Sequence, residues 1–222
     1  MSGIPDLDDR TLFPPFLDLP EAEDGDAATE KKTAGQPALL AQVKNNMTIN
    51  KPTLVLSDRD GHSFALVFDG LDRDGLDLEG LGFRPGTTIL VPAARRTIPA
   101  ARADDGSSSP ETINSKAARR PFLRIPAGQA DTVQVMPAAL DQVVAAASRL
   151  RLREQQHETG QDRQCSTCGT TPDAGPAAKR LLKCTGCSEA WYCNKACQTQ
   201  GWKDGHKGEC KAIRAVATVW GS

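Results

Sequence analysis

The chain has 222 residues, of which 25% are charged and 5% aromatic, and its formal net charge is −1. A net charge so close to zero argues against a protein that binds nucleic acid mainly by electrostatic attraction. No apolar run approaches the roughly 18 residues of a membrane helix, and no secretory leader opens the sequence. We therefore expect a soluble intracellular protein with no membrane partner.

The first 40 residues are the most acidic part of the chain, with nine acidic and three basic side chains and a net charge of −6. Acidic residues around a few large apolar ones cannot build a core alone, so residues 1–40 are expected to form a disordered acidic tail. Its one apolar island contains the segment Pro14–Leu17. The two prolines hold this segment extended, and its apolar surface needs a cover.

Residues 41–136 are expected to form a β-rich domain, because short apolar and β-branched runs alternate there with glycine, proline and aspartate turns. Five strands are predicted, at residues 53–56, 63–68, 87–91, 122–125 and 132–136. A polar stretch at residues 99–120 predicts a long flexible loop before the fourth strand. This pattern favours a small, mainly-β barrel, with an OB-like fold as the candidate topology.

Residues 137–164 are expected to form a helix followed by a linker. Pro137 begins the predicted helix, which runs to about Gln155 and carries an apolar stripe with helical spacing. The stripe consists of Leu140, Val143, Val144, Ala147 and Leu150. Part of it should pack on the barrel. The arginines of the last turns suit the negative end of the helix dipole.

All seven cysteines of the protein fall between residues 165 and 210, and with His206 they make eight metal ligands in four pairs. The pairs are Cys165/Cys168, Cys184/Cys187, Cys193/Cys197 and His206/Cys210. Two tetrahedral zinc ions need eight ligands of this kind. The alternative, a disulfide framework, fits poorly because seven is odd and no secretory leader is present. We predict two Zn²⁺ ions per chain.

The residues around these ligands resemble a MYND-type zinc finger over residues 165–210. The matching features are Tyr192 before the fifth ligand, Gln198 after the sixth, Trp202 four residues later, and the pair His206-Lys207. A RING finger usually places its histidine earlier in the ligand order. A HIT-type finger also ends in a His–Cys pair, but the spacing from Gln198 to Trp202 favours MYND. The spacer of residues 169–183 is longer than the family pattern and is expected to bulge out as a loop.

The resemblance implies an interleaved pairing of the ligands. Cys165, Cys168, Cys193 and Cys197 would hold one zinc ion, and Cys184, Cys187, His206 and Cys210 the other. It also implies a module for protein–protein interaction, in which Gln198 and Trp202 contact proline-rich peptides of partner proteins. The chain's own Pro14–Leu17 segment is a candidate ligand for that surface. Residues 211–222 are expected to continue as a C-terminal helical extension.

Catalysis and nucleic-acid binding are the functions that compete with this interpretation. The sequence contains no nucleophile–base pair, no phosphate-binding loop and no recognisable SET segments, so we predict that the protein is not an enzyme. Nucleic-acid binding through an OB-like barrel is the alternative function. It would need aromatic stacking platforms and a basic groove, whereas residues 41–160 carry a net charge of only +1. We do not expect nucleic-acid partners.

Overall fold

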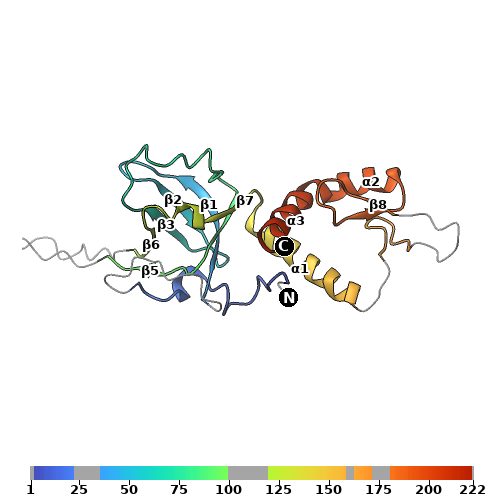
Figure 1. The fold of residues 1–222 in the computed structure, drawn as a ribbon, viewed down its shortest axis with the longest axis horizontal. Helices are drawn as coiled ribbons and strands as arrows, with labels where there is room; N and C mark the ends of the chain where they lie inside the picture. The colour runs from blue at the N-terminus through green and yellow to red at the C-terminus, as the bar shows by residue number, and fades with distance from the viewer. Residues whose placement is uncertain (1–2, 23–35, 100–119, 159–162, 172–180, 222) are drawn as a thin grey trace, which may run out of the picture.

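The computed structural model describes residues 3–22, 36–99, 120–158, 163–171 and 181–221. The chain forms two lobes side by side, a sheet lobe and a lobe of helices that carries the cysteines (Figure 1). Most of the loop predicted at residues 99–120 lies outside the described residues. None of the helices in the described part combines the length and apolar character needed to cross a membrane.

The sheet lobe is built on one seven-stranded sheet with the strand order β5-β6-β3-β2-β1-β4-β7. Neighbouring strands are antiparallel except β3 and β6, which are parallel. The strands are β1 (Leu39–Asn46), β2 (Thr53–Ser57), β3 (Ser63–Phe68), β4 (Thr88–Val91), β5 (Arg96–Thr97), β6 (Phe122–Ile125) and β7 (Gln134–Met136). The five predicted strands correspond to β2, β3, β4, β6 and β7.

The predicted barrel is not closed. Strands β5 and β7 are the two edges of the sheet, and no ladder joins them in the described part of the chain. The sequence prediction missed β1, an apolar run that crosses from the acidic segment into the β-rich one. This strand pairs with β2 on one side and β4 on the other, and so lies between two of the predicted strands.

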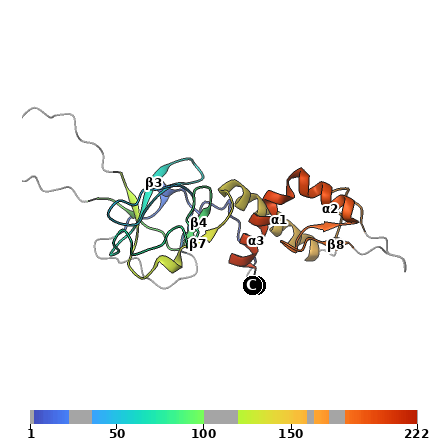
Figure 2. The ribbon, with the colours of Figure 1, turned by 90° about the horizontal axis from the view of Figure 1, so that it is seen from above.

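The second lobe contains α1 (Leu140–Glu158), α2 (Lys195–Gly201) and α3 (Lys207–Trp220), with the short hairpin β8 (Leu182–Lys183) and β9 (Trp191–Tyr192). Helix α1 starts three residues after Pro137 and packs along α3. Seen from above, α1 and α3 lie between the sheet and the β8 hairpin (Figure 2). The predicted stripe of α1 is buried, apart from the half-buried Val144. It packs in one cluster with α3 and with residues of β1, β4 and β7, so α1 joins the two lobes.

The acidic N-terminal segment is not a disordered tail over residues 3–22, which we call the N-terminal strap. Leu7, Phe16 and Leu19 are buried in the strap, with at most 2% of their surface exposed. The ring of Phe16 stacks on that of Phe64, with 3.9 Å between the centroids. The acidic composition hid this packing, because the carboxylates lie towards solvent or in ion pairs while the apolar side chains between them point inward. Residues 23–35 lie outside the described part.

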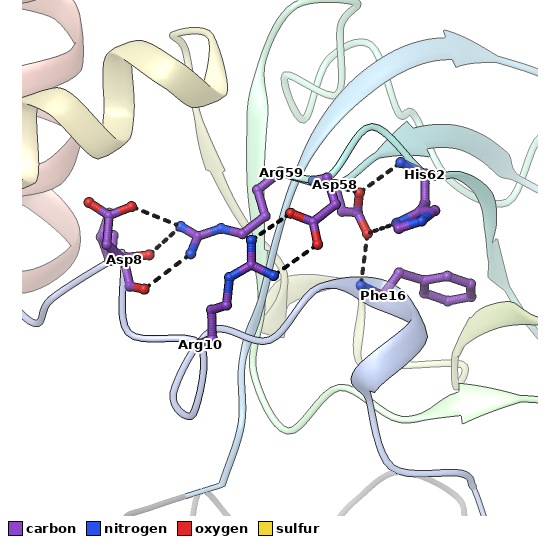
Figure 3. Close-up of polar contacts among 8 residues, drawn as sticks. Asp8, Arg10, Phe16, Asp58, Arg59 and His62 are labelled. Atoms are coloured by element: carbon purple, nitrogen blue, oxygen red, sulfur yellow. Dashed lines mark hydrogen bonds and ion pairs between the residues drawn. The ribbon is translucent and has the colours of Figure 1, made fainter.

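The turn between β2 and β3 anchors the strap (Figure 3). The buried carboxylate of Asp58 accepts hydrogen bonds from the backbone N–H groups of Phe16, at 2.9 Å, and of His62, at 2.8 Å. Arg10 donates two hydrogen bonds to Asp60, at 2.9 and 2.8 Å. Arg59 donates to the backbone carbonyl of Leu7.

These contacts correct the expectation that Pro14–Leu17 is a free ligand for the finger. Pro14, Pro15 and Phe16 are buried in the sheet lobe, and only Leu17 of the segment is exposed. The apolar surface that needed a cover is therefore covered by the sheet rather than by Trp202. The strap also touches the second lobe, where the rings of Phe13 and Trp220 form a T-shaped contact and Asp6 pairs with Arg151 at 2.7 Å.

Candidate metal centre

The first group of ligands brings together Cys165, Cys168, Cys193 and Cys197, whose sulfur atoms all lie within 4.8 Å of one another. The sulfur of Cys193 is 3.6 Å from that of Cys168 and 3.4 Å from that of Cys197. The first knuckle is tied to β9 by the N–H of Ser166, which donates to the carbonyl of Trp191 at 2.7 Å.

The start of α2 places the other two ligands of this group. The side chain of Asn194 caps the helix by accepting from the N–H of Cys197 at 2.8 Å, which suits asparagine at a helix N-terminus. Cys193 therefore stands just before the helix and Cys197 in its first turn. The two sulfurs come together although only Cys197 is helical, so the spacing of four residues does not reflect a shared helical face here.

The second group consists of Cys184, Cys187, His206 and Cys210, all buried and also within 4.8 Å of one another. The sulfurs of Cys184 and Cys210 are 3.9 Å apart. The Nε2 atom of His206 lies 3.3 Å from the sulfur of Cys184 and 3.6 Å from that of Cys187. Gly205, with a φ of 140°, breaks the helix immediately before His206, at a conformation that glycine adopts without strain.

These distances can be tested against the geometry of bound zinc. A tetrahedral zinc ion with Zn–S bonds of about 2.3 Å places two sulfurs about 3.8 Å apart, and a sulfur and an imidazole nitrogen about 3.5 Å apart. The five separations given above run from 3.3 to 3.9 Å, and all other pairs of ligand atoms within a cluster lie within 4.8 Å. Four cysteines, or three cysteines with one histidine, are also typical donor sets of structural zinc. The two clusters thus fit two zinc ions, with the interleaved pairing expected from the sequence.

The thiols of each cluster shift one another's acidity when no metal is bound. A hydrogen bond with Cys193 raises the pKa of Cys197 to about 12, and burial together with the nearby sulfurs of Cys187 and Cys184 raises the pKa of Cys210 to about 12. In contrast, hydrogen bonds from Thr170 lower the pKa of Cys168 to about 6. Several thiolates cannot share such a small space unless a cation neutralises them, and zinc supplies that charge.

The remaining predicted site residues, Gln198 and Trp202, lie on the outside of the finger. Gln198 is half-buried in α2, and Trp202 follows one turn later, where its backbone N–H donates to the backbone carbonyl of Gln198. Trp202 is 43% exposed, and its indole stands edge-on to the ring of His206, with 5.9 Å between the centroids. The tryptophan thus rests on a metal ligand while one side faces solvent.

The residues that support the second cluster from outside were not predicted from the sequence. Arg149 and Arg153 of α1, interpreted as complements of the helix dipole, reach across to Glu209 and to the backbone of Glu189. The only signal in the sequence is their spacing of four residues, which places both on one face of the helix.

Comparison with known protein families finds a match in this part of the chain. Residues 165–210 match the family model described as the MYND finger. These residues form a MYND finger. Its two Cys/His clusters make it a zinc-binding module of the kind that mediates protein–protein interactions.

Two relatives from Arabidopsis thaliana are similar to about a quarter of the chain. Ubiquitin carboxyl-terminal hydrolase 19 is 40% identical over 53 residues, which is 24% of this chain and 7% of that protein. Histone-lysine N-methyltransferase ASHR1 is 35% identical over 57 residues, which is 26% of this chain and 10% of that protein. The chain thus spans at most a tenth of the length of these relatives. No solved structure matches it.

Proposed function

We propose that this MYND finger recognises proline-containing peptides of partner proteins through Gln198 and Trp202, and that the chain works as an adaptor without catalysis of its own. The observation that carries the proposal is the exposure of Trp202, because tryptophan is usually well buried. Here 43% of its surface is exposed while the ring packs against His206 in a T-shaped contact. An aromatic ring held in place before binding loses little entropy when a partner docks.

The chemistry of the neighbouring side chains supports a proline-containing ligand. An indole face packs well on a pyrrolidine ring, and an extended proline segment is already ordered before it binds. Gln198, one helical turn away, has an amide that can bond to the carbonyl groups of such a segment. A reducing intracellular setting, which keeps the cysteines available for zinc, goes with this proposal.

The alternative of nucleic-acid binding finds little support in the sheet lobe. Stacking with bases requires exposed aromatic faces. Phe64, Phe68 and Phe83 are buried in the core of the lobe, and Phe122 is half-buried. The described part of the sheet lobe therefore lacks the aromatic platform that this function needs.

A peptide array tests the proposal directly. The full chain, loaded with zinc, is applied to decapeptides that each contain two prolines and to copies in which alanine replaces both prolines. We expect binding that depends on the prolines, and a loss of affinity of roughly tenfold or more in Trp202→Ala, as for an aromatic hot spot.

Leu182→Ala is the matched control, because Leu182 is also an exposed apolar residue of the finger, at 45%. This variant should bind like the wild type. The zinc content of Trp202→Ala is measured in parallel, since Trp202 touches His206. Equal binding by the two variants, or no preference for proline, would refute the proposal.

A further inference from the structure

The second zinc cluster is supported by a helix that lies outside the MYND match. Both terminal nitrogens of Arg149, in α1, donate to the carboxylate of Glu209 in α3, at 2.5 and 3.0 Å. A two-point contact between a guanidinium and a carboxylate fixes the orientation of both groups. The arginine thus holds Glu209 in a defined position against the finger.

Glu209 in turn faces the histidine ligand. Its Oε2 atom lies 3.9 Å from Nδ1 of His206, whereas Nε2 on the other side of the ring faces the sulfurs of Cys184 and Cys187. At 3.9 Å the contact is electrostatic rather than a hydrogen bond. A carboxylate beside the non-ligating nitrogen of a histidine favours a proton there and leaves the other nitrogen free for the metal.

A second arginine of the same helix reaches the cysteine knuckle of this cluster. Arg153 donates to the backbone carbonyl of Glu189, and the N–H of Glu189 points at the sulfur of Cys187 over 3.5 Å. Two cationic side chains from α1 thus lie beside a zinc site whose three thiolates and Zn²⁺ leave one negative charge.

Within the described residues, the other cluster is supported by hydrogen bonds from within the finger, between Thr170 and Cys168 and from Asn194 to Cys193, rather than by ion pairs. Cys168 is exposed, Cys193 and Cys197 are half-buried, and no ion pair in the described part of the chain reaches a neighbour of these ligands. The two zinc sites of the finger therefore differ in what surrounds them.

We propose that α1 stabilises the second zinc site. Arg149 acts as a positioning residue that orients His206 through Glu209. The full chain accordingly holds the zinc ion of Cys184, Cys187, His206 and Cys210 more tightly than the finger motif would by itself.

Zinc removal from the full chain by a chelator tests this proposal. In Arg149→Met, the affinity of the second site should fall by roughly 10-fold, the lower end of the range for losing a direct partner of a metal ligand, because Arg149 acts through Glu209; the first site should be unchanged. Cadmium-113 NMR assigns the effect, because a site of four thiolates and a site of three thiolates and an imidazole give separate resonances. Only the resonance of the histidine-containing site should shift or broaden.

Arg151→Met is the matched control. Arg151 lies on the same helix and forms its ion pair with Asp6 of the strap, at 2.7 Å, rather than with the finger. Its loss should leave both metal sites unchanged. If Arg149→Met and Arg151→Met behave alike, the proposal is wrong.

A charge swap separates positioning from simple docking of the helices. The double variant Arg149→Glu, Glu209→Arg keeps an ion pair between α1 and α3 but removes the carboxylate beside His206. We expect its second zinc site to remain as weak as in Arg149→Met, although circular dichroism shows a folded chain. Restoration of wild-type zinc affinity by the swap would show that Arg149 only docks the helices, and would overturn the assignment.

Discussion

The buried carboxylate of Asp58 holds together two parts of the sheet lobe. Its side chain has no exposed surface, and it accepts from the backbone N–H groups of Phe16, Asp60 and His62. A single residue thus closes the β2–β3 turn and attaches the strap to it.

Asp58→Ala should therefore cost stability well beyond the loss of one contact. It leaves backbone donors without partners, and each buried unpaired donor costs about 1–3 kcal/mol. We expect the free energy of unfolding, measured in urea, to fall by about 2–4 kcal/mol. Asp60→Ala is the control, because it removes only the more exposed pair with Arg10. An equally small effect of both changes would contradict this role of Asp58.

Gly186 lies where the second zinc cluster has no room for a side chain. A Cβ atom at this position would stand 2.8 Å from the sulfur of Cys210. Gly186→Ala should therefore displace that ligand and weaken the second site, as measured by competition with a chelator. Gly208→Ala, in α3, meets nothing closer than 3.5 Å and should leave zinc affinity unchanged. Zinc affinity in Gly186→Ala equal to that of the wild type would argue against the close approach.

The eight ligands could be predicted from sequence, because a tetrahedral site restricts how closely its ligands follow one another along the chain. The contact between Arg149 and Glu209 could not, because it depends on how α1 packs against α3, 60 residues further on. Spacing encodes local geometry, whereas the surroundings of the metal are set by tertiary packing.

At the scale of elements, the strap is the largest difference between expectation and structure. The acidic composition of residues 1–40 predicted disorder. That prediction took no account of the large apolar residues spaced along the segment, all of which are buried: Ile4, Leu7, Phe13, Phe16 and Leu19. Strand β1 was missed for a related reason, since its apolar half adjoins the acidic segment and its other half is polar. Segments that become buried only by packing on the sheet have a sequence pattern too weak to predict them locally.

The strap should contribute measurably to the stability of the sheet lobe. Phe16 is 2% exposed and stacks on Phe64, so Phe16→Ala should lower the free energy of unfolding by about 3–5 kcal/mol. Its neighbour Leu17 is 44% exposed, and Leu17→Ala should change stability by no more than about 0.5 kcal/mol. Urea unfolding of the two variants decides the point. Similar small losses in both would mean that the strap is not held on the sheet in solution.

At the scale of the whole molecule, the two lobes should differ in their dependence on metal. One apolar cluster, which includes Phe16, Leu54, Leu66 and Ile89, lies wholly within the strap and the sheet lobe. The finger has little apolar core of its own, and metal binding is a large part of the folding free energy of such modules. Chelation should therefore remove the amide NMR dispersion of α2 and the β8 hairpin while β2 and β3 keep theirs. Joint collapse of both lobes would contradict this division.

Zinc stoichiometry tests the central claim most directly, and native mass spectrometry of the full chain measures it. We predict two zinc ions per chain in the wild type. Cys168→Ser should lose only the ion shared with Cys193, and Cys210→Ser only the ion shared with His206, so each variant should retain one. Fewer than two zinc ions in the wild type, or loss of both ions from either variant, would contradict the pair of separate, interleaved sites on which the account of this finger rests.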